Sequence, residues 1–153
     1  MREILFRGKS ASNGEWYVGS LLKETIEKTK ETKIIYSIKE HNIGFLDDWT
    51  FEPTYISGFD EEVIPETVGQ YTGFTDKNGK KIFEGDIVKH YNHSDYGFDI
   101  GAMYWDEVFL QWKRTSIWNF HHSSFTYSIS RTCEYEVIGN IHDNPELLQG
   151  EQE

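Results

Sequence analysis

Three carboxylates lie close together in one short run of the chain, and carboxylates are versatile chemical groups. Asp76, Glu84 and Asp86 fall within residues 70–89, QYTGFTDKNGKKIFEGDIVK. Clustered carboxylates act as general acids and bases or as metal ligands. Asp also occupies turns, where its side chain accepts hydrogen bonds from nearby backbone N–H groups. The turn interpretation accounts for all three residues, and we favour it over a catalytic or metal site.

Other residues that could bind a metal or act as a nucleophile form weaker patterns. His90, His93 and Asp95 have the types of metal ligands, but no second ligand pair with a recognised spacing accompanies them. Cys133 is the single cysteine, so no intramolecular disulfide forms, and no base is linked to it in the sequence. Glu66 extends the carboxylate set. We predict no catalytic residue, no metal ligand and no cofactor.

The run 70–89 has the composition of a turn-rich β segment. Asn78-Gly79 is the dipeptide that best tolerates the two positive φ angles of a type I′ hairpin turn. Gly73 indicates a bulge or a close backbone approach. A second turn at 84–86 is followed by the β-branched and aromatic stretch 87–91, which predicts another strand.

The same run resembles the hallmark of the YopX-like family of phage and prophage proteins. Residues 1–9, MREILFRGK, and 13–21, NGEWYVGSL, are similar to the family's opening, and 136–148, EVIGNIHDNPELL, to its ending. The resemblance therefore runs from end to end, although 24–60 and 91–132 contribute little. The matching residues, which we interpret as structural, are Tyr71, Thr72, Gly73, Asp76, Asn78, Gly79, Glu84, Gly85, Asp86, Gly139, Asn140, Asn144 and Pro145.

The resemblance implies a mainly β fold: a small SH3-type barrel with additional N-terminal strands and a short C-terminal helix. It also implies a location in the cytoplasm of a bacterial host, and it brings no established catalytic residues. We expect one domain over 1–153, within which the N-terminal strands 1–62 and the barrel-like part 63–148 can form two subdomains.

Strand signals outside the run agree with a mainly β fold. Between 98–105 and 108–114, Asp106-Glu107 predicts a tight polar turn, while 21–32 is left open between helix and loop. Asn144 and Pro145 predict the cap and first residue of a short helix. The further predicted strands are 3–7, 15–19, 33–38, 124–130 and 135–141.

Charge and aromatic content limit the partners. The formal net charge is −11, and 40–76 contains no Lys or Arg, which disfavours general nucleic-acid binding. A local basic face is conceivable around Lys77, Lys80, Lys81 and Lys89, but lysines at hairpin edges also prevent edge-to-edge association. We expect most aromatic residues to be core, with one or two exposed at an interface; an alternative is a stacking platform made by Phe109, Trp105, Trp112, Trp118 and Phe120.

Three functional hypotheses follow. The leading one is a non-enzymatic accessory module that binds a protein partner or itself. The second is a nucleic-acid-related role, through the local basic face or through acidic mimicry of DNA by 40–76. The third is a small metal-dependent hydrolase that uses Glu66, Asp76, Glu84 and Asp86. No apolar run has the length of a signal peptide or of a membrane span, so we predict a cytoplasmic protein without membrane partners.

Overall fold

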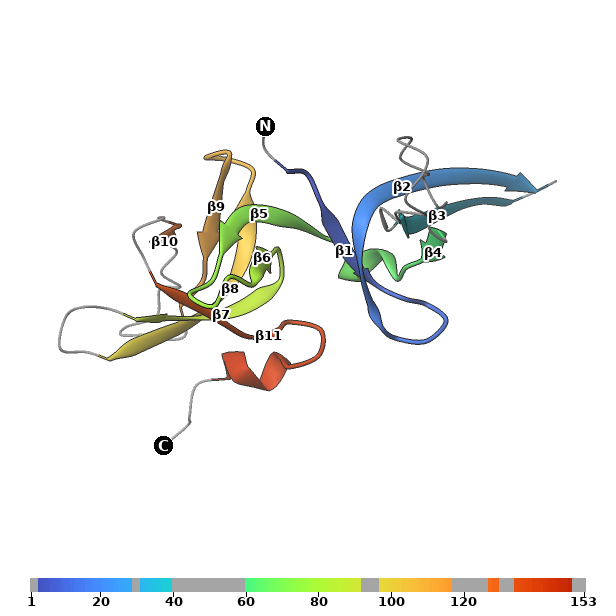
Figure 1. The fold of residues 1–153 in the computed structure, drawn as a ribbon. Coiled ribbons are helices and arrows are strands. Elements are labelled where there is room, and N and C mark those ends of the chain that lie inside the picture. The colour runs from blue at the N-terminus through green and yellow to red at the C-terminus, as the bar shows by residue number, and fades with distance from the viewer. Residues whose placement is uncertain are drawn as a thin grey trace, which may run out of the picture. The chain divides into compact units, whose positions relative to one another are not determined.

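The computed structural model describes residues 3–28, 31–39, 60–91, 97–116, 127–129 and 134–149. The chain divides into two compact units, Glu3–Gln70 and a unit that begins at Tyr71. Both consist almost entirely of antiparallel strands (Figure 1), which confirms the predicted mainly β fold. The predicted single domain over 1–153 stays a prediction.

The N-terminal unit is one antiparallel sheet. Its strand order is β4-β3-β2-β1, and β1 also pairs with residues 69–70 at the start of β5. The segment 21–32, which the sequence left open between helix and loop, contributes to two long strands. The elements are β1 (Phe6–Lys9), β2 (Trp16–Lys28), β3 (Glu31–Lys39), β4 (Asp60–Glu62) and the 3-10 turn η1 (Pro65–Thr67).

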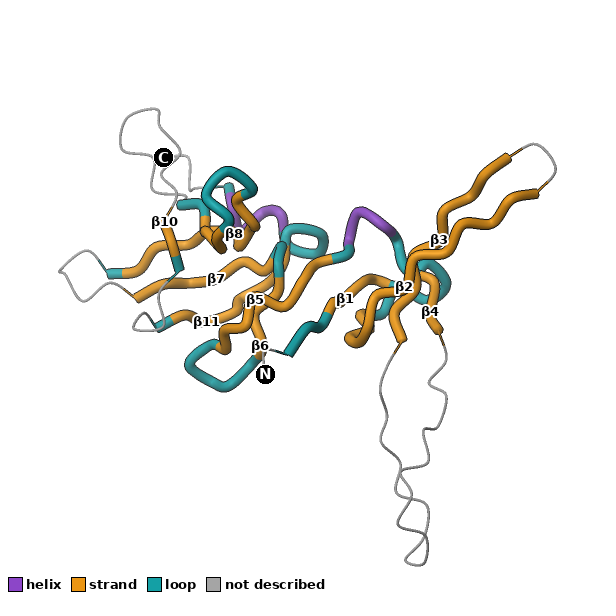
Figure 2. Tube along the Cα trace, turned by 90° about the horizontal axis from the view of Figure 1, so that it is seen from above, coloured by secondary structure: helices purple, strands orange, loops and turns teal. Residues whose placement is uncertain are grey.

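The outer part of β2 and β3 is a two-stranded ribbon. β1 pairs with β2 only over residues 16–19, and β4 pairs with β3 only over 37–39. Among the described residues, 24–28 of β2 and 31–35 of β3 therefore pair only with each other, and Figure 2 shows them leaving the sheet together. Below the ribbon, the core contains Ile38 and Val63, at 0% and 2% exposure.

The C-terminal unit contains a five-stranded sheet and a separate hairpin. The sheet has the order β10-β9-β8-β7-β11, and the hairpin pairs residues 71–75 of β5 with β6. Between them lies a core of Ile82, Val88, Met103 and Tyr135. The elements are β5 (Gly69–Thr75), β6 (Lys81–Phe83), β7 (Asp86–Tyr91), β8 (Phe98–Asp106), β9 (Gln111–Arg114), β10 (Tyr127–Ser128), β11 (Tyr135–Asn140) and the 3-10 turn η2 (Pro145–Leu148).

Two details of the predicted architecture are not confirmed. The strands of the described chain form open antiparallel sheets without closing into a barrel, so the SH3-type barrel is not confirmed. In place of a C-terminal α-helix there is the single 3-10 turn η2. Pro145 begins this turn as predicted, but the side chain of Asn144 makes no capping hydrogen bond. No helix in the described part of the chain is long and apolar enough to span a membrane.

The hairpin at Asn78-Gly79 is confirmed, but the predicted type I′ turn is wrong. Gly79 has a φ of 82°, whereas Asn78 does not adopt a positive φ. The reason is the side chain of Asp76. Its Oδ1 accepts hydrogen bonds from the N–H groups of Asn78 at 2.8 Å and Lys80 at 2.9 Å. These bonds stabilise a turn in which only Gly79 needs a positive φ. The bulge predicted at Gly73 is confirmed by its φ of 86° and by a register shift between β5 and β6.

The turn between β8 and β9 also differs from the prediction. β8 continues to Asp106 and β9 begins only at Gln111, so the turn is 107–110 and is not the tight polar pair Asp106-Glu107. Asp106 initiates the turn by accepting backbone hydrogen bonds. The predicted start of the strand at Val108 is therefore wrong, and three apolar residues lie in the turn.

The backbone of a neighbouring segment approaches β8 so closely at Gly101 that a side chain has no room there. A Cβ atom built on Gly101 would lie 1.8 Å from the carbonyl oxygen of Thr115, far below any real contact. The adjacent pairing explains the crowding, because Thr115 donates its N–H to the carbonyl of Ala102 at 2.9 Å and its hydroxyl accepts from the N–H of Ala102 at 2.9 Å. The chain after β9 therefore lies directly over Gly101.

We predict that Asp76→Asn lowers the free energy of unfolding at pH 7 by about 1–3 kcal/mol, because the amide has one acceptor oxygen where the carboxylate uses both. Burial alone would raise the pKa of Asp76, but hydrogen bonds from the backbone of Lys80, Val137 and Asn78 hold it below its usual value. A lowered pKa in the folded state contributes stability above the unfolded value of about 3.9, and this contribution is lost as the pH falls through the folded value.

Urea denaturation of wild type and variant at pH 7 and pH 3 measures this effect. The stability difference between the two proteins should shrink at pH 3, whereas the exposed Glu66→Gln should match wild type at pH 7. An Asp76→Asn difference of the same size at both pH values would contradict the assignment.

Candidate functional site

Asp76, one of the three clustered carboxylates, uses both oxygens as backbone acceptors. Besides the two turn bonds at Oδ1, its Oδ2 accepts the N–H of Val137 at 3.2 Å. The neighbouring Lys77 donates its N–H to the carbonyl of Tyr135 at 2.9 Å. Asp76 is 7% exposed, so its carboxylate joins the hairpin turn to β11 from a buried position.

The other predicted carboxylates occupy different turns. Asp86 is 1% exposed and accepts the N–H of Phe83 at 2.8 Å, which closes the turn between β6 and β7. Glu84 lies half-buried in that turn, and Glu66 is exposed in η1 of the N-terminal unit. In the described ranges, no three His, Cys, Asp or Glu side chains are grouped so as to hold a metal ion. His93, Asp95 and Cys133 lie outside these ranges.

The remaining motif residues of the central run also serve the hairpin. The hydroxyl of Thr72 donates to the carbonyl of Ile82 at 2.8 Å and accepts the N–H of Phe74 at 3.2 Å, beside the bulge at Gly73. Tyr71 is 7% exposed, and its ring lies 5.6 Å from that of Phe83.

The matching residues near the C-terminus form a second tight turn. Asn140 accepts the N–H groups of His142 and Asp143, both at 2.9 Å. A Cβ on Gly139 would lie 2.7 Å from Oδ1 of Asn144, so any other residue there would displace the side chain of Asn144. Gly85, with a φ of 79°, accepts the N–H of Ile141 at 2.9 Å and thereby joins the central run to the C-terminal stretch.

The lysines of the central hairpin are largely engaged within the protein. Lys77 forms an ion pair with Glu136 at 2.7 Å, and its ammonium lies 4.6 Å from the ring centroid of Tyr91. Lys89 lies 3.6 Å above the ring of Phe98, and Lys81 lies 5.5 Å from the ring of Tyr71. These contacts hold the lysines against aromatic rings.

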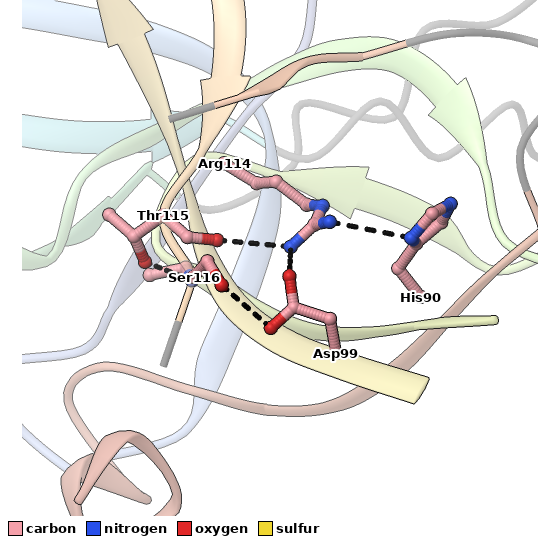
Figure 3. Close-up of polar contacts among 6 residues, drawn as sticks. His90, Asp99, Arg114, Thr115 and Ser116 are labelled. Atoms are coloured by element: carbon pink, nitrogen blue, oxygen red, sulfur yellow. Dashed lines mark hydrogen bonds and ion pairs between the residues drawn. The ribbon is translucent and has the colours of Figure 1, made fainter. Parts of the chain in front are cut away.

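A partly buried ionic cluster lies on β7, β8, β9 and the residues just after β9, and the sequence did not predict it. We call His90, Asp99, Arg114 and Ser116 the Arg114 cluster (Figure 3). Arg114 is 4% exposed and donates from Nη1 to Oδ2 of Asp99 at 2.5 Å and to the carbonyl of Thr115 at 3.2 Å. Ser116 donates its hydroxyl to Oδ1 of Asp99 at 2.9 Å.

His90 completes the Arg114 cluster from the neighbouring strand. Nη2 of Arg114 lies 3.3 Å from Nδ1 of His90, and His90 stands opposite Asp99 in the sheet. Arginine has only donors, so Nδ1 of His90 is the acceptor in this contact. The cluster therefore ties three adjacent strands together through one guanidinium group.

The turn between β8 and β9 carries three exposed apolar side chains, which we call the apolar tip. Val108, Phe109 and Leu110 are 83%, 66% and 72% exposed. Leu110 has a φ of 51° and is the one described residue other than glycine with a positive φ. This conformation costs an L-residue roughly 1–2 kcal/mol. Turn positions of this kind usually hold Gly or Asn.

The apolar tip is held in place by polar residues at its base. Oδ1 of Asp106 accepts the N–H groups of Val108 and Phe109, both at 2.9 Å, and Oδ2 pairs with the ammonium of Lys113 at 2.6 Å. Lys113 and the N–H of Phe109 hold the pKa of Asp106 below its usual value. The same ammonium lies 4.1 Å from the ring centroid of Phe109. The tip thus has a defined conformation while its side chains face solvent.

The two tryptophans of this hairpin lie away from the tip. Trp105 and Trp112 stand opposite each other with ring centroids 5.1 Å apart, and Trp112 is 7% exposed. Trp112 is thus core, as predicted, whereas Phe109 and Phe98 are exposed. The ring N–H of Trp112 has no hydrogen-bond partner among the described residues. Trp118 and Phe120 lie outside the described ranges.

We predict that Arg114→Met lowers the free energy of unfolding by about 3 kcal/mol, because it leaves the largely buried carboxylate of Asp99, whose side chain is 15% exposed, without its counter-charge. The double variant Arg114→Met with Asp99→Leu should lose less, because neither charge is then left alone. Urea denaturation of the double-mutant cycle measures the coupling. Lys39→Met is the matched control: its ion pair with Asp60 is longer, at 3.8 Å, and exposed, so it should cost less than about 1 kcal/mol. A loss below about 1 kcal/mol for Arg114→Met would show that the cluster is not structural.

Comparisons with known proteins identify the family. The family described as YopX protein matches residues 5–149. Among solved structures, the chain is similar to the crystal structure of protein EF1440 from Enterococcus faecalis, with 22% sequence identity, a TM-score of 0.44, and coverage of 97% of this chain and 99% of that chain. No curated protein matches the chain. Because the family match spans nearly the whole sequence, the chain belongs to the YopX family.

Proposed function

We propose that this chain is a phage or prophage accessory protein that acts by binding a partner protein, with the apolar tip as its anchor. The phage setting and the cytoplasm of a bacterial host are what the family resemblance implies. The absence of an enzymatic activity is part of the same proposal. The observation that carries it is the exposure of Val108, Phe109 and Leu110 together on a turn that Asp106 holds by hydrogen bonds.

Exposure of the tip leaves a sizeable free energy available for binding. Fully burying one large apolar side chain is worth about 1.5–3 kcal/mol. Three such side chains next to one another resemble the small clusters that dominate many protein interfaces. A turn of polar residues would connect β8 and β9 at least as well, so connecting the strands does not explain the apolar side chains.

The conformation of Leu110 adds a second argument. A glycine at its φ of 51° would be unstrained, yet the position carries a large apolar side chain. Strain that the fold does not need supports a hypothesis of function. Asp106 and Lys113 preorganise the tip, which reduces the entropy lost on binding.

Charge defines the kind of partner. The chain has a net charge of −11, Glu107 lies exposed beside the tip, and Asp106 and Lys113 neutralise each other. We therefore expect a protein surface with an apolar pocket surrounded by basic side chains. The same charge disfavours insertion of the tip into an anionic membrane surface.

The SH3-type barrel remains a proposal for the C-terminal unit. Its support is the set of short antiparallel strands around the core of Ile82, Val88, Met103 and Tyr135. An experimental structure of the full chain tests it: closure of the sheet through the residues outside the described ranges would establish the barrel, and an open sheet throughout would exclude it.

The double variant Val108→Ser with Phe109→Ser should lose the partner. Losing two buried apolar contacts should weaken binding more than about a hundredfold. The measurement is quantitative capture from host lysate by the immobilised full chain, followed by titration of the captured protein. Ile4→Ser is the matched control, because Ile4 is 65% exposed in the N-terminal unit and should leave capture unchanged. Equal capture by wild type and tip variant, or no capture by wild type, would refute the proposal.

Leu110→Gly should separate stability from binding. Glycine relieves the left-handed strain but has more freedom in the unfolded chain, so the free energy of unfolding should change by less than about 1 kcal/mol. Capture of the partner should nevertheless weaken by about tenfold or more, because an apolar contact is lost. Thermal unfolding and the same titration test this pair of outcomes. A large loss of stability would instead assign Leu110 to the fold.

A further inference from the structure

The ribbon of β2 and β3 presents an unpaired strand edge. Residues 21–28 of β2 pair with β3 on one side and, in the described part of the chain, with no strand on the other. Isolated two-stranded ribbons are marginally stable in water, and a free edge exposes a row of N–H and C=O groups that can pair with another strand. Figure 2 shows this ribbon apart from β1 and β4.

The charge of this segment differs from that of the rest of the chain. In a protein with a net charge of −11, two copies repel each other over most of their surface. Residues 20–33 contain four lysines and three glutamates and are therefore nearly neutral. Two copies can approach here without like-charge repulsion. The charged residues are Lys23, Glu24, Glu27, Lys28, Lys30, Glu31 and Lys33.

Symmetry restricts how two β2 edges can pair. In an antiparallel pair related by a two-fold axis, the residue on the axis stands opposite its own copy, because hydrogen-bonded and non-hydrogen-bonded positions alternate. Residues opposite each other are then an even number of positions apart. Lys23 cannot stand opposite Lys28, nor Glu24 opposite Glu27, because these separations are odd.

One register combines the longest overlap with favourable charges. With Thr25 on the axis, residues 22–28 of both copies overlap up to the end of β2, and Lys23 stands opposite Glu27 on each side of the axis. An axis at Glu24 or Lys23 would place a like charge opposite itself, and an axis at Ile26 would shorten the overlap to 24–28. Opposite charges directly across a strand pair are stabilising.

We propose that two copies of the chain associate through antiparallel pairing of their β2 edges about a two-fold axis at Thr25, which joins the two ribbons into four strands. Thr25 is exposed, and the ammonium of exposed Lys23 lies 5.5 Å from the ring of Tyr36. The surface is in the N-terminal unit, whereas the apolar tip is in the C-terminal unit, so this association is independent of the proposed partner binding.

Disulfide crosslinking tests the register directly. Residues opposite each other in an antiparallel pair have Cα atoms about 4.5–5.5 Å apart, within the range that a disulfide spans. In full-length protein with Cys133→Ser, Thr25→Cys should form a covalent dimer at low micromolar concentration under mild oxidation. Asn78→Cys, in the exposed turn of the central hairpin, is the matched control and should crosslink at least tenfold more slowly.

A charge swap provides the second test in the protein without added cysteines. Lys23→Glu should weaken dimerisation by roughly tenfold, since two like-charge pairs replace two opposite-charge pairs, and Lys23→Glu with Glu27→Lys should restore it. Light scattering over a concentration series gives the dissociation constants. A monomer at all concentrations would overturn the proposal. So would crosslinking of Thr25→Cys no faster than the control, or a dimer insensitive to the swap.

Discussion

The C-terminal unit depends on carboxylates that satisfy backbone N–H groups at its turns. Asp76 accepts three of them from two segments of the chain, and Asp86 closes the next turn from a fully buried position. A buried N–H group without a partner costs about 1–3 kcal/mol, so Asp76 stabilises its own turn and β11 together, and Asp86 stabilises the turn between β6 and β7. The contact between Gly85 and Ile141 continues this arrangement to the C-terminal stretch.

The short strand β9 contributes both to a buried charge and to an exposed apolar turn. Consecutive residues of a strand face opposite sides, and here Arg114 enters the buried cluster with Asp99 while Lys113 supports Asp106 beneath the apolar tip. A charge is thus buried and three apolar side chains are exposed within one hairpin. The buried charge is paired and hydrogen-bonded, whereas Val108, Phe109 and Leu110 remain 66–83% exposed even though the ammonium of Lys113 lies against the ring of Phe109.

Local chemistry made much of the fold predictable. Asn78-Gly79, Gly73 and the turn at 84–86 carry short-range signals, and each appears where it was expected. The type of the 78–79 turn was not predictable from the dipeptide, because the side chain of Asp76 sets it through hydrogen bonds. The segment 21–32 has no clear periodicity, and the strand conformation of its described residues, 21–28 and 31–32, follows from the pairing of β2 with β3.

The candidate sites were less predictable than the fold. The Arg114 cluster joins His90, Asp99 and Arg114 from three strands, and no spacing of these residues in the sequence indicates that they are in contact. The apolar tip did carry a signal, since Asp106 is a typical turn initiator followed by Val108, Phe109 and Leu110. That signal favoured a strand, because apolar residues are more common in strands than in exposed turns.

The crowding at Gly101 also limits how this sequence can diverge. Any side chain there would collide with the carbonyl of Thr115, so the position is closed to all nineteen alternatives unless the chain after β9 moves. Gly79 and Gly97 have open space around them and are restricted only by their positive φ, a conformation that asparagine tolerates. In related sequences with the same backbone, we therefore expect substitutions at Gly79 and Gly97 and none at Gly101.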